Sequence, residues 1–311
     1  MSNKRLVISI ATFNRPNGLK AVLDGIEVQV LPDEVDLRVV IIDNSQDANA
    51  RGYIDNRKRE YPFPLMYLNE KGPGITYPRN RGIEEALKGK DDYIIFTDDD
   101  VLVDKNWINE LFSVAEETEA AAVSGAVKAK YKQKPPWWIE KGGFFEVVDL
   151  PDRQPVEYGH TTNSLVRVAL LRELNLRFDP FFSLTGGEDT SFFQAIRDAG
   201  KTTVFSLNAL VYECIGPERL TLSWWLKRWY RTGNTEGLIE LREGKRFGTS
   251  VIFYKGMLRI VMGGLGSLVA LPALVIGKVD FYNHLRILSR GFGFLASVFG
   301  VAYEEYRNHK R

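Results

Sequence analysis

Residues 93–100 read YIIFTDDD, an apolar run that ends in the consecutive aspartates Asp98, Asp99 and Asp100. A short run of aliphatic and aromatic residues is typical of a buried strand. Three adjacent carboxylates at its end cannot all ionise cheaply, because like charges repel at close range. A divalent cation relieves this repulsion, since Mg²⁺ and Mn²⁺ take carboxylate oxygens and bridge to substrate phosphates. The run therefore predicts a strand followed by a metal site, and the alternative is a solvated loop or a helix cap.

Polar clusters also follow two other predicted strands. The apolar runs at 6–11 and 37–42 end at Thr12–Arg15 and Asp43–Ser45. Continuous apolar strands separated by helical patterns predict an α/β fold, with a mostly parallel sheet covered on both faces. Ligands bind beyond the carboxyl ends of such strands, so we expect the three clusters to share one rim of the sheet. Further strands are predicted at 65–68, 121–127 and 144–148, and helices from Pro16, at 77–87, from Asp104 as a cap, and at 189–199.

Composition limits the class of protein. The chain has 311 residues, of which 44% are hydrophobic and 26% charged, and its formal net charge is +1. This is an ordinary globular balance, and no basic field argues for a nucleic-acid partner. Cys214 is the only cysteine, which excludes an intramolecular disulfide and a cysteine-rich zinc site. Because no signal-peptide pattern precedes the first strand, we expect a reducing, cytoplasmic-side location.

Taken in order, the motifs resemble those of the family 2 glycosyltransferases with the GT-A fold, similar to bacterial exopolysaccharide and surface-polysaccharide enzymes. The resemblance covers about residues 5–235. It implies a Rossmann-like catalytic domain at 1–220, with a nucleotide-sugar half at 1–118 and an acceptor half at 119–220, followed by a helical region at 221–311. The motifs that carry it are Thr12-Phe13-Asn14-Arg15, Asp43, Gly74–Gly82 with Arg79, Asp98-Asp99-Asp100 as a DxD motif, and Gly186-Gly187-Glu188-Asp189.

On the donor side, the resemblance assigns Thr12, Asn14, Arg15, Asp43, Arg79, Asp98 and Asp99 to the nucleotide sugar. Asp43 would accept a hydrogen bond from the N–H of uracil, which favours a UDP-sugar, and its alternative is an Asx turn. Arg79 would approach the diphosphate or orient Asp98, and its alternative is a surface arginine. Asp98 would face the ribose or sugar, whereas Asp100 would hold Mn²⁺ or Mg²⁺ against the departing diphosphate.

On the acceptor side, transfer with inversion needs one general base for the acceptor hydroxyl. The resemblance gives that role to Asp189, with Glu188 binding the acceptor or orienting the site. The alternative is that both are first-turn acids stabilised by a helix dipole. The Gly186-Gly187 pair would leave room for close substrate approach.

Two departures from the family pattern bear on the site. Many relatives have a histidine that completes the metal site, and Glu213 stands at about that place, as a third metal ligand or as a bystander. His160 precedes a segment that resembles the acceptor-side floor, and a plain polar loop is its alternative. The family's processive synthases carry a Gln-x-x-Arg-Trp motif, but Trp225 replaces the glutamine before Arg228-Trp229. This favours the addition of one sugar per acceptor.

The region beyond residue 220 is predicted to attach to a membrane. Residues 260–277 contain no charged side chain. The length of this run is near the lower limit for a helix that crosses a membrane. The segment Trp224–Arg231 mixes tryptophan with basic residues, as suits anionic headgroups. We expect peripheral or monotopic attachment at the cytoplasmic face of the inner (plasma) membrane. The alternative is a helical subdomain packed on the catalytic domain or on a homodimer partner.

The sequence therefore predicts a metal-dependent, inverting, non-processive glycosyltransferase. Its donor would be a UDP-sugar such as UDP-glucose, and its acceptor a glycan linked to polyprenyl diphosphate in exopolysaccharide or surface-polysaccharide synthesis. The first alternative is a sugar nucleotidyltransferase, although residues 12–18 lack the Gly-rich basic loop that usually holds a triphosphate. The second is a non-catalytic, membrane-attached carbohydrate- or nucleotide-binding module.

Overall fold

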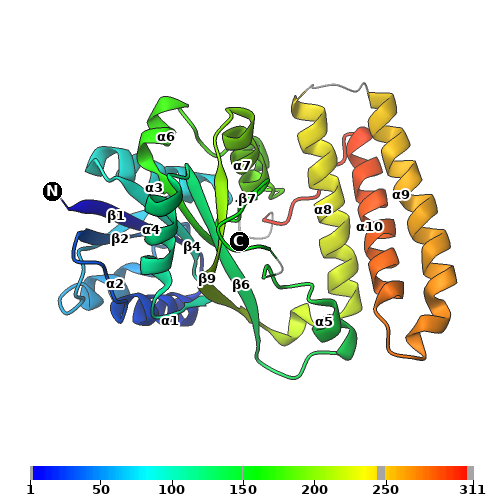
Figure 1. Cartoon of the computed structure of the whole chain (residues 1–311), viewed down its shortest axis with the longest axis horizontal. Coiled ribbons are helices and arrows are strands. Elements are labelled where there is room, and N and C mark those ends of the chain that lie inside the picture. The colour runs from blue at the N-terminus through cyan, green and yellow to red at the C-terminus, as the bar shows by residue number, and fades with distance from the viewer. Residues whose placement is uncertain (1–2, 149, 244–248, 307–311) are drawn as a thin grey trace.

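The computed structural model describes residues 3–148, 150–243 and 249–306, and its centre is a nine-stranded mixed sheet (Figure 1). The strand order is β3-β2-β1-β4-β8-β6-β9-β5, and β7 pairs with β9. The first four strands in this order are parallel to one another, and β8 runs antiparallel to both of its neighbours. The strands are β1 (Lys4–Thr12), β2 (Val35–Asp43), β3 (Leu65–Asn69), β4 (Tyr93–Asp98), β5 (Val101–Val103), β6 (Ala122–Tyr131), β7 (Pro155–Val156), β8 (Asn163–Arg167) and β9 (Thr203–Ile215).

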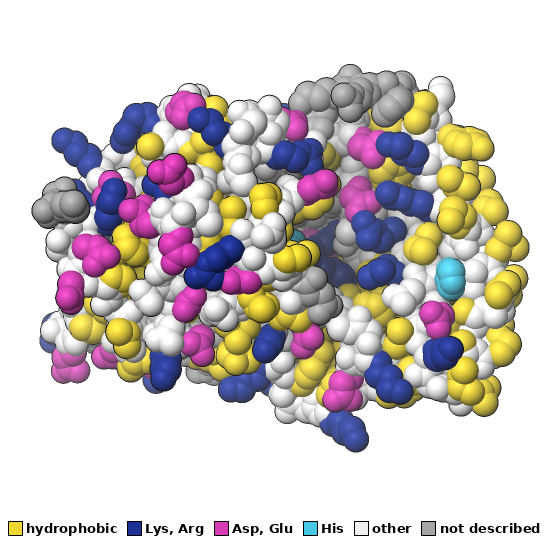
Figure 2. Space-filling view, viewed as in Figure 1, with side chains coloured by type: hydrophobic (Ala, Val, Ile, Leu, Met, Phe, Trp, Pro, Cys, Tyr) yellow, Lys and Arg dark blue, Asp and Glu magenta, His cyan; other side chains and the backbone are white. Residues whose placement is uncertain are grey.

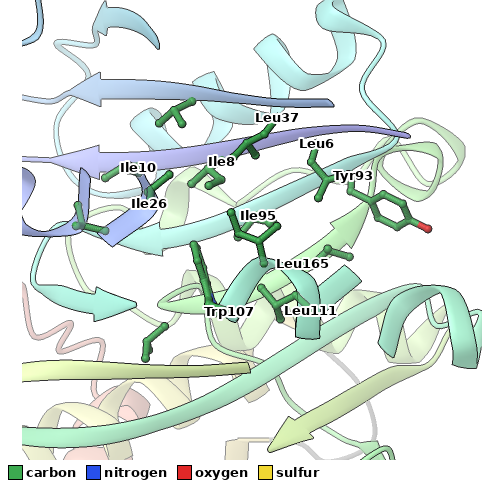
Figure 3. Close-up of a cluster of buried hydrophobic side chains, with 14 of the residues drawn as sticks. Leu6, Ile8, Ile10, Ile26, Leu37, Tyr93, Ile95, Trp107, Leu111 and Leu165 are labelled. Carbon is green, nitrogen blue, oxygen red and sulfur yellow. The ribbon is translucent and has the colours of Figure 1, made fainter. Parts of the chain in front are cut away.

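Helices cover both faces of this sheet and close two separate apolar cores. In β1, Leu6, Ile8 and Ile10 enter one core, whereas Val7 enters the other, as the two-residue period of a strand requires. Figure 3 shows part of the first core, in which Ile26 of α1 and Trp107 and Leu111 of α4 lie against strand residues. The helices around the sheet are α1 (Pro16–Glu27), α2 (Arg51–Arg57), α3 (Thr76–Gly89), α4 (Trp107–Thr118), α5 (Trp137–Gly142), α6 (Val168–Glu173) and α7 (Glu188–Asp198).

Two local predictions are wrong. Residues 144–148 form no strand and contribute only one isolated bridge, between Val127 and Val147. Their aromatic side chains instead pack on α8, where Phe145 lies 4.6 Å from the Trp225 ring. Asp104 does not cap α4, which begins at Trp107; it accepts a hydrogen bond from the Asn106 N–H, 3.1 Å away, and so forms an Asx turn just before the helix.

Three long helices form a layer beside the sheet: α8 (Leu222–Glu243), α9 (Thr249–Ala270) and α10 (Asp280–Val298). Helix α10 lies between the other two, and α9 is outermost (Figure 1). Two glycines allow α8 and α10 to approach closely. A Cβ at Gly233 would lie 2.0 Å from the Arg290 carbonyl oxygen, and a Cβ at Gly293 would lie 1.8 Å from that of Tyr230. The 3-10 turns are η1 (Pro180–Phe182), η2 (Pro217–Arg219) and η3 (Leu271–Leu274).

Helix α9 presents an apolar face that nothing in the described chain covers. Thr249–Leu274 is the one described helical stretch long and apolar enough to cross a membrane, with mean hydropathy 1.7. Leu265, Leu268 and Val269 are 61%, 65% and 82% exposed. The charged residues of this helix turn inward, because Lys255 pairs with Glu240 and Arg259 with Glu236, both on α8. Helix α9 therefore contains a paired, charged first half in addition to part of the charge-free run at 260–277.

Candidate active site

A single cavity of about 1090 Å³ lies between the sheet rim and the helical layer. Figure 2 shows it as a hollow, with basic side chains along the wall that the helices provide (Figure 2). The carboxyl ends of β1 and β4, the start of α7 and the inner sides of α8, α9 and α10 all contribute lining residues. Among the predicted site residues, those that line the cavity are Thr12, Arg15, Arg79, Asp98, Asp99, Asp100, Glu188, Asp189 and Glu213.

The acidic run divides into one internal and two cavity-facing roles. Asp99 is 3% exposed and binds the turn after β1. Its carboxylate accepts hydrogen bonds from the Thr12 hydroxyl (2.8 Å) and the Arg15 guanidinium (3.0 Å). Arg15 also pairs with Asp100 at 2.9 Å. Asp99 therefore ties the ends of β1 and β4 together, and Asp98 and Asp100 carry the charge that faces the cavity.

Arg79 connects the acidic run to the start of α7. One of its guanidinium nitrogens lies 3.2 Å from Asp98 Oδ1, and another donates to Glu188 Oε1. The second Asp98 oxygen accepts from the Thr162 hydroxyl at 2.7 Å. Arg79 is 7% exposed, so it is not a surface helix arginine. Its position matches the prediction that it orients Asp98, and a charge-assisted pair of this kind fixes both partners.

The electrostatics at Asp100 suit a cation. Burial, and next the charge of Asp98, raise the pKa of Asp100 to about 7. A divalent ion would reverse this effect by stabilising both carboxylates. In the described ranges, no three Asp, Glu, His or Cys side chains converge to hold a metal alone. The residues present thus fit an ion held by one or two carboxylates together with phosphate oxygens, which is how Mg²⁺ is usually bound beside nucleotides.

Glu213, predicted as a third metal ligand or a bystander, pairs with an arginine in this structure, and its role at a metal stays a prediction. Its carboxylate pairs with the Arg219 guanidinium at 2.7 Å. Arg219 is in turn held over the rings of Phe145 and Trp224, 5.0 Å from each centroid. Glu213 lies beside the acidic run, because the Cys214 N–H donates to the Asp100 carbonyl oxygen. It lines the same cavity as Asp98 and Asp100.

Asp43 and Asn14 do not reach the cavity. Asp43 is 0% exposed, and its carboxylate accepts from the Ser45 and Ala50 N–H groups and from the Tyr67 hydroxyl, at 2.8–3.0 Å. The bond to Ser45 forms the Asx turn that was the alternative, and the contact of Asp43 with a nucleotide base stays a prediction. Asn14 accepts from the Asn49 side chain. The neighbouring Asn44, which sequence reasoning did not single out, does line the cavity.

The two acids that open α7 have opposite protonation tendencies. Glu188 is 4% exposed, and burial raises its pKa to about 7. Its Oε2 is buried without a hydrogen-bond partner in the described part of the chain. Burial also acts to raise the pKa of Asp189, but the neighbouring His160 outweighs it and brings the value to about 2. Asp189 is therefore an anion at neutral pH, and Glu188 is poised between its two forms.

His160 is a site residue that the sequence left open. Its Nδ1 lies 3.9 Å from Asp189 Oδ2, which is an ion contact rather than a hydrogen bond. Burial lowers the pKa of His160, but the Asp189 carboxylate more than compensates, so the net shift is upward. The only signal in the sequence was its place two residues before Thr162, which binds Asp98.

The Gly186-Gly187 pair lines the cavity and also lies beside the helical layer, and close substrate approach at these glycines stays a prediction. Both residues have positive φ, +79° and +94°, where side chains are strained. A Cβ at Gly187 would lie 2.0 Å from Thr235 Cγ2 on α8. A Cβ at Gly186 would lie 3.7 Å from the Tyr306 ring. The side chain of Thr235 therefore occupies the space beside Gly187, whereas Gly186 has room for ordinary contact with Tyr306.

Known proteins share this sequence pattern and this fold. Residues 7–174 match the family described as Glycosyl transferase family 2. The "Succinoglycan biosynthesis protein ExoM" of Rhizobium meliloti is 33% identical over 241 residues, which is 77% of each chain. Two solved structures of S. aureus TarS 1–349, in complex with UDP and with UDP-GlcNAc, superpose with TM-scores of 0.53 and 0.54 at 15% identity, over 93% of this chain and 91% of theirs. The family match spans more than half of the chain and the curated relative covers three quarters of it, so the chain belongs to glycosyl transferase family 2.

Proposed function

We propose that this glycosyltransferase is inverting, metal-dependent and non-processive, and moves one sugar from a UDP-sugar, such as UDP-glucose, to a lipid-linked oligosaccharide. One observation carries the proposal: a single cavity is lined both by Asp98 and Asp100 and by Asp189. A leaving diphosphate and an attacking hydroxyl must lie on opposite sides of the transferred sugar for inversion. One cavity bounded by both sets of carboxylates supports that arrangement.

In this mechanism Asp189 takes the proton of the acceptor hydroxyl as its oxygen attacks the anomeric carbon. The bond from that carbon to the diphosphate breaks, and its electron pair leaves with the UDP. Asp189 is ionised at neutral pH, which is the form that a base needs. Arg79 holds Asp98 and Glu188 in fixed positions between the two halves of the site. A divalent cation at Asp98 and Asp100 supplies neutralisation of the charge on the leaving diphosphate.

The donor and pathway assignments draw on the relatives. The TarS structures contain UDP and UDP-GlcNAc, which supports a uridine nucleotide donor here. ExoM is named for succinoglycan biosynthesis, which supports a role in exopolysaccharide or surface-polysaccharide synthesis. A glycan on polyprenyl diphosphate would bring the acceptor to a membrane surface, and the exposed face of α9 would hold the enzyme there, on the cytoplasmic side where nucleotide sugars are made.

The experiment is a transfer assay with purified full-length protein, UDP-sugars, Mn²⁺ and lipid-linked acceptors. We expect Asp189→Asn to lower kcat by about 10²–10⁴-fold, the usual contribution of a general base, with nucleotide binding within twofold of the parent. Asp198→Asn, at the other end of α7, is the matched control and keeps parental kcat. EDTA should abolish transfer, and Mn²⁺ should restore it.

Each outcome separates the proposal from its rivals. Transfer by Asp189→Asn at the parental rate would disprove the base assignment, and full activity in EDTA would disprove metal dependence. Formation of a UDP-sugar from UTP and a sugar 1-phosphate would identify a nucleotidyltransferase. Binding of nucleotide or glycan with no turnover of any donor would identify a binding module.

A further inference from the structure

We propose that Tyr306 forms the acceptor-side wall of the catalytic cavity and positions the acceptor sugar beside Asp189. The proposal rests on the transfer reaction given above and names a residue that none of the family motifs contains. Tyr306 comes from the segment 301–306, which follows α10 and returns from the helical layer to the catalytic domain. Its ring lines the same cavity as Glu188 and Asp189.

The segment 301–306 is held at both ends. On the helical side, Asn234 of α8 donates to the Val301 carbonyl oxygen (2.7 Å) and accepts from the Tyr303 N–H (2.8 Å). Asn234 is 1% exposed, so these bonds lie in a buried environment. On the catalytic side, the Tyr306 N–H donates to the Leu184 carbonyl oxygen at 3.0 Å. The segment is therefore a fixed bridge from α8 to the loop that precedes α7.

An ion pair strengthens the bridge next to the cavity. Glu305 lies 3.3 Å from the Arg231 guanidinium, and both residues line the cavity. Arg231 and Tyr306 together fill the space beside Gly186, at 3.9 Å and 3.7 Å from the place of its Cβ. The ring of Tyr306 thus faces the turn that delivers Glu188 and Asp189 into the site.

The chemistry of this wall suits the ring of a sugar, which carries both C–H and hydroxyl groups. An aromatic ring offers an apolar face to the C–H groups of a pyranose, and the phenol offers one hydrogen bond at its edge. Burial, and next the charge of Glu188, raise the pKa of Tyr306, so the phenol stays neutral. The backbone of Tyr306 is fixed to Leu184, in the loop that leads to Glu188 and Asp189, and this contact is the reason for assigning its ring to the acceptor.

The test compares full-length Tyr306→Ala and Tyr306→Phe with Tyr303→Phe, which removes a hydroxyl from the same segment. We expect Tyr306→Ala to raise the acceptor KM at least tenfold, with the donor KM and the Kd for UDP within twofold of the parent. Tyr306→Phe should give an intermediate acceptor KM, and Tyr303→Phe the parental one. Thermal denaturation of each variant checks that the chain is folded.

An unchanged acceptor KM in a folded Tyr306→Ala variant would overturn the inference. An equal rise in donor and acceptor KM would also overturn it, because it would place the ring on the donor side. Failure of the parent to transfer sugar to any acceptor would instead contradict the proposed function, so the two failures are distinguishable.

Discussion

At the scale of single residues, the site depends on which carboxylates are neutralised by the chain itself. Arg15, Arg79 and Arg219 each pair with a carboxylate at the cavity: Asp100, Glu188 and Glu213 respectively. Asp189 has no arginine partner among the described contacts and faces His160 instead. An imidazole changes its charge near neutral pH, whereas a guanidinium does not. The proposed base is therefore paired with a group whose charge changes with pH.

This contact predicts the pH dependence of transfer. The pKa of His160 is raised by Asp189 despite burial, so below that pKa the imidazolium stabilises the Asp189 anion and makes it a weaker base. As pH rises through the pKa, the charge is lost and kcat should rise. Glu188, Glu213 and Arg79 also face this pair, through the cavity and α7. In the parent, this rise of kcat with pH (the acid limb of the profile) should be centred above the ordinary histidine pKa of about 6.5.

The measurement is kcat against pH from 5.5 to about 9 for the parent, His160→Ala and the control His284→Ala on α10. We expect His160→Ala to lose the limb and to show higher kcat than the parent at the acid end. The control should keep the parental profile. A limb that stays at the same pH in His160→Ala would assign it to another group, for which Glu188 is the candidate.

At the scale of elements, the strands that the sequence predicts well are those buried on both faces. The run 93–96 is apolar throughout and 37–42 is apolar apart from Arg38, so neither the neighbouring strands nor their register are needed to recognise them. The strands β5 and β7, of three and two residues, escape such reading because only their pairing with β9 makes them strands. The run at 144–148 fails for the opposite reason: its aromatics are apolar, but they serve the contact with α8.

The same limit applies to the site. The strand-end clusters were predictable because parallel strands bring their carboxyl ends to one rim. The Arg79–Glu188 pair joins residues 109 positions apart, and the contact of Gly187 with Thr235 joins the catalytic domain to α8. Neither pairing leaves a local pattern in the sequence. Asp43 looked like a ligand residue for a related reason, since an Asx turn and a base contact need the same side chain at a strand end.

The close packing of α8 on the turn before α7 predicts a double-variant result. Gly187→Ala should destabilise the protein by about 1–3 kcal/mol from backbone strain at positive φ, with more from the 2.0 Å approach to Thr235. Thr235→Gly in the same chain removes the steric part and leaves the strain. We therefore expect the double variant to lose less melting temperature, relative to the parent, than the sum of the losses of the two single variants.

Thermal denaturation of the parent, both single variants and the double variant measures this coupling. Gly264→Ala on α9, where a Cβ would meet nothing within 4 Å, is the matched control for adding a methyl group to the helical region. Strict additivity of the Gly187 and Thr235 effects would show that α8 does not press on the turn.

At the scale of the whole molecule, the helical layer has two different sides. Its inner side lines the cavity and lies against the turn before α7, with Thr235 beside Gly187 and Arg231 beside Gly186. Its outer side is the apolar face of α9, which Figure 2 shows as a run of hydrophobic side chains along one edge of the molecule (Figure 2). Exposed apolar positions recur on α9 at Val261, Leu265, Leu268 and Val269, the spacing of a single helix face. A continuous exposed apolar face of this kind marks an interaction surface.

We predict that this face attaches the enzyme to lipid. The parent should float with vesicles that contain anionic lipid, and Leu265→Glu/Val269→Glu should stay in the soluble fraction, because carboxylates disfavour both the apolar layer and the anionic surface. Val28→Glu/Val30→Glu adds the same charge at valines that are 66% and 61% exposed in the catalytic domain, and this control should still float. The α9 variant should keep parental kcat with a water-soluble acceptor analogue but lose transfer to acceptors embedded in vesicles. If the parent stays soluble and light scattering gives a dimer that the α9 substitutions dissociate, the face is covered by a second copy of the chain and the membrane assignment is wrong.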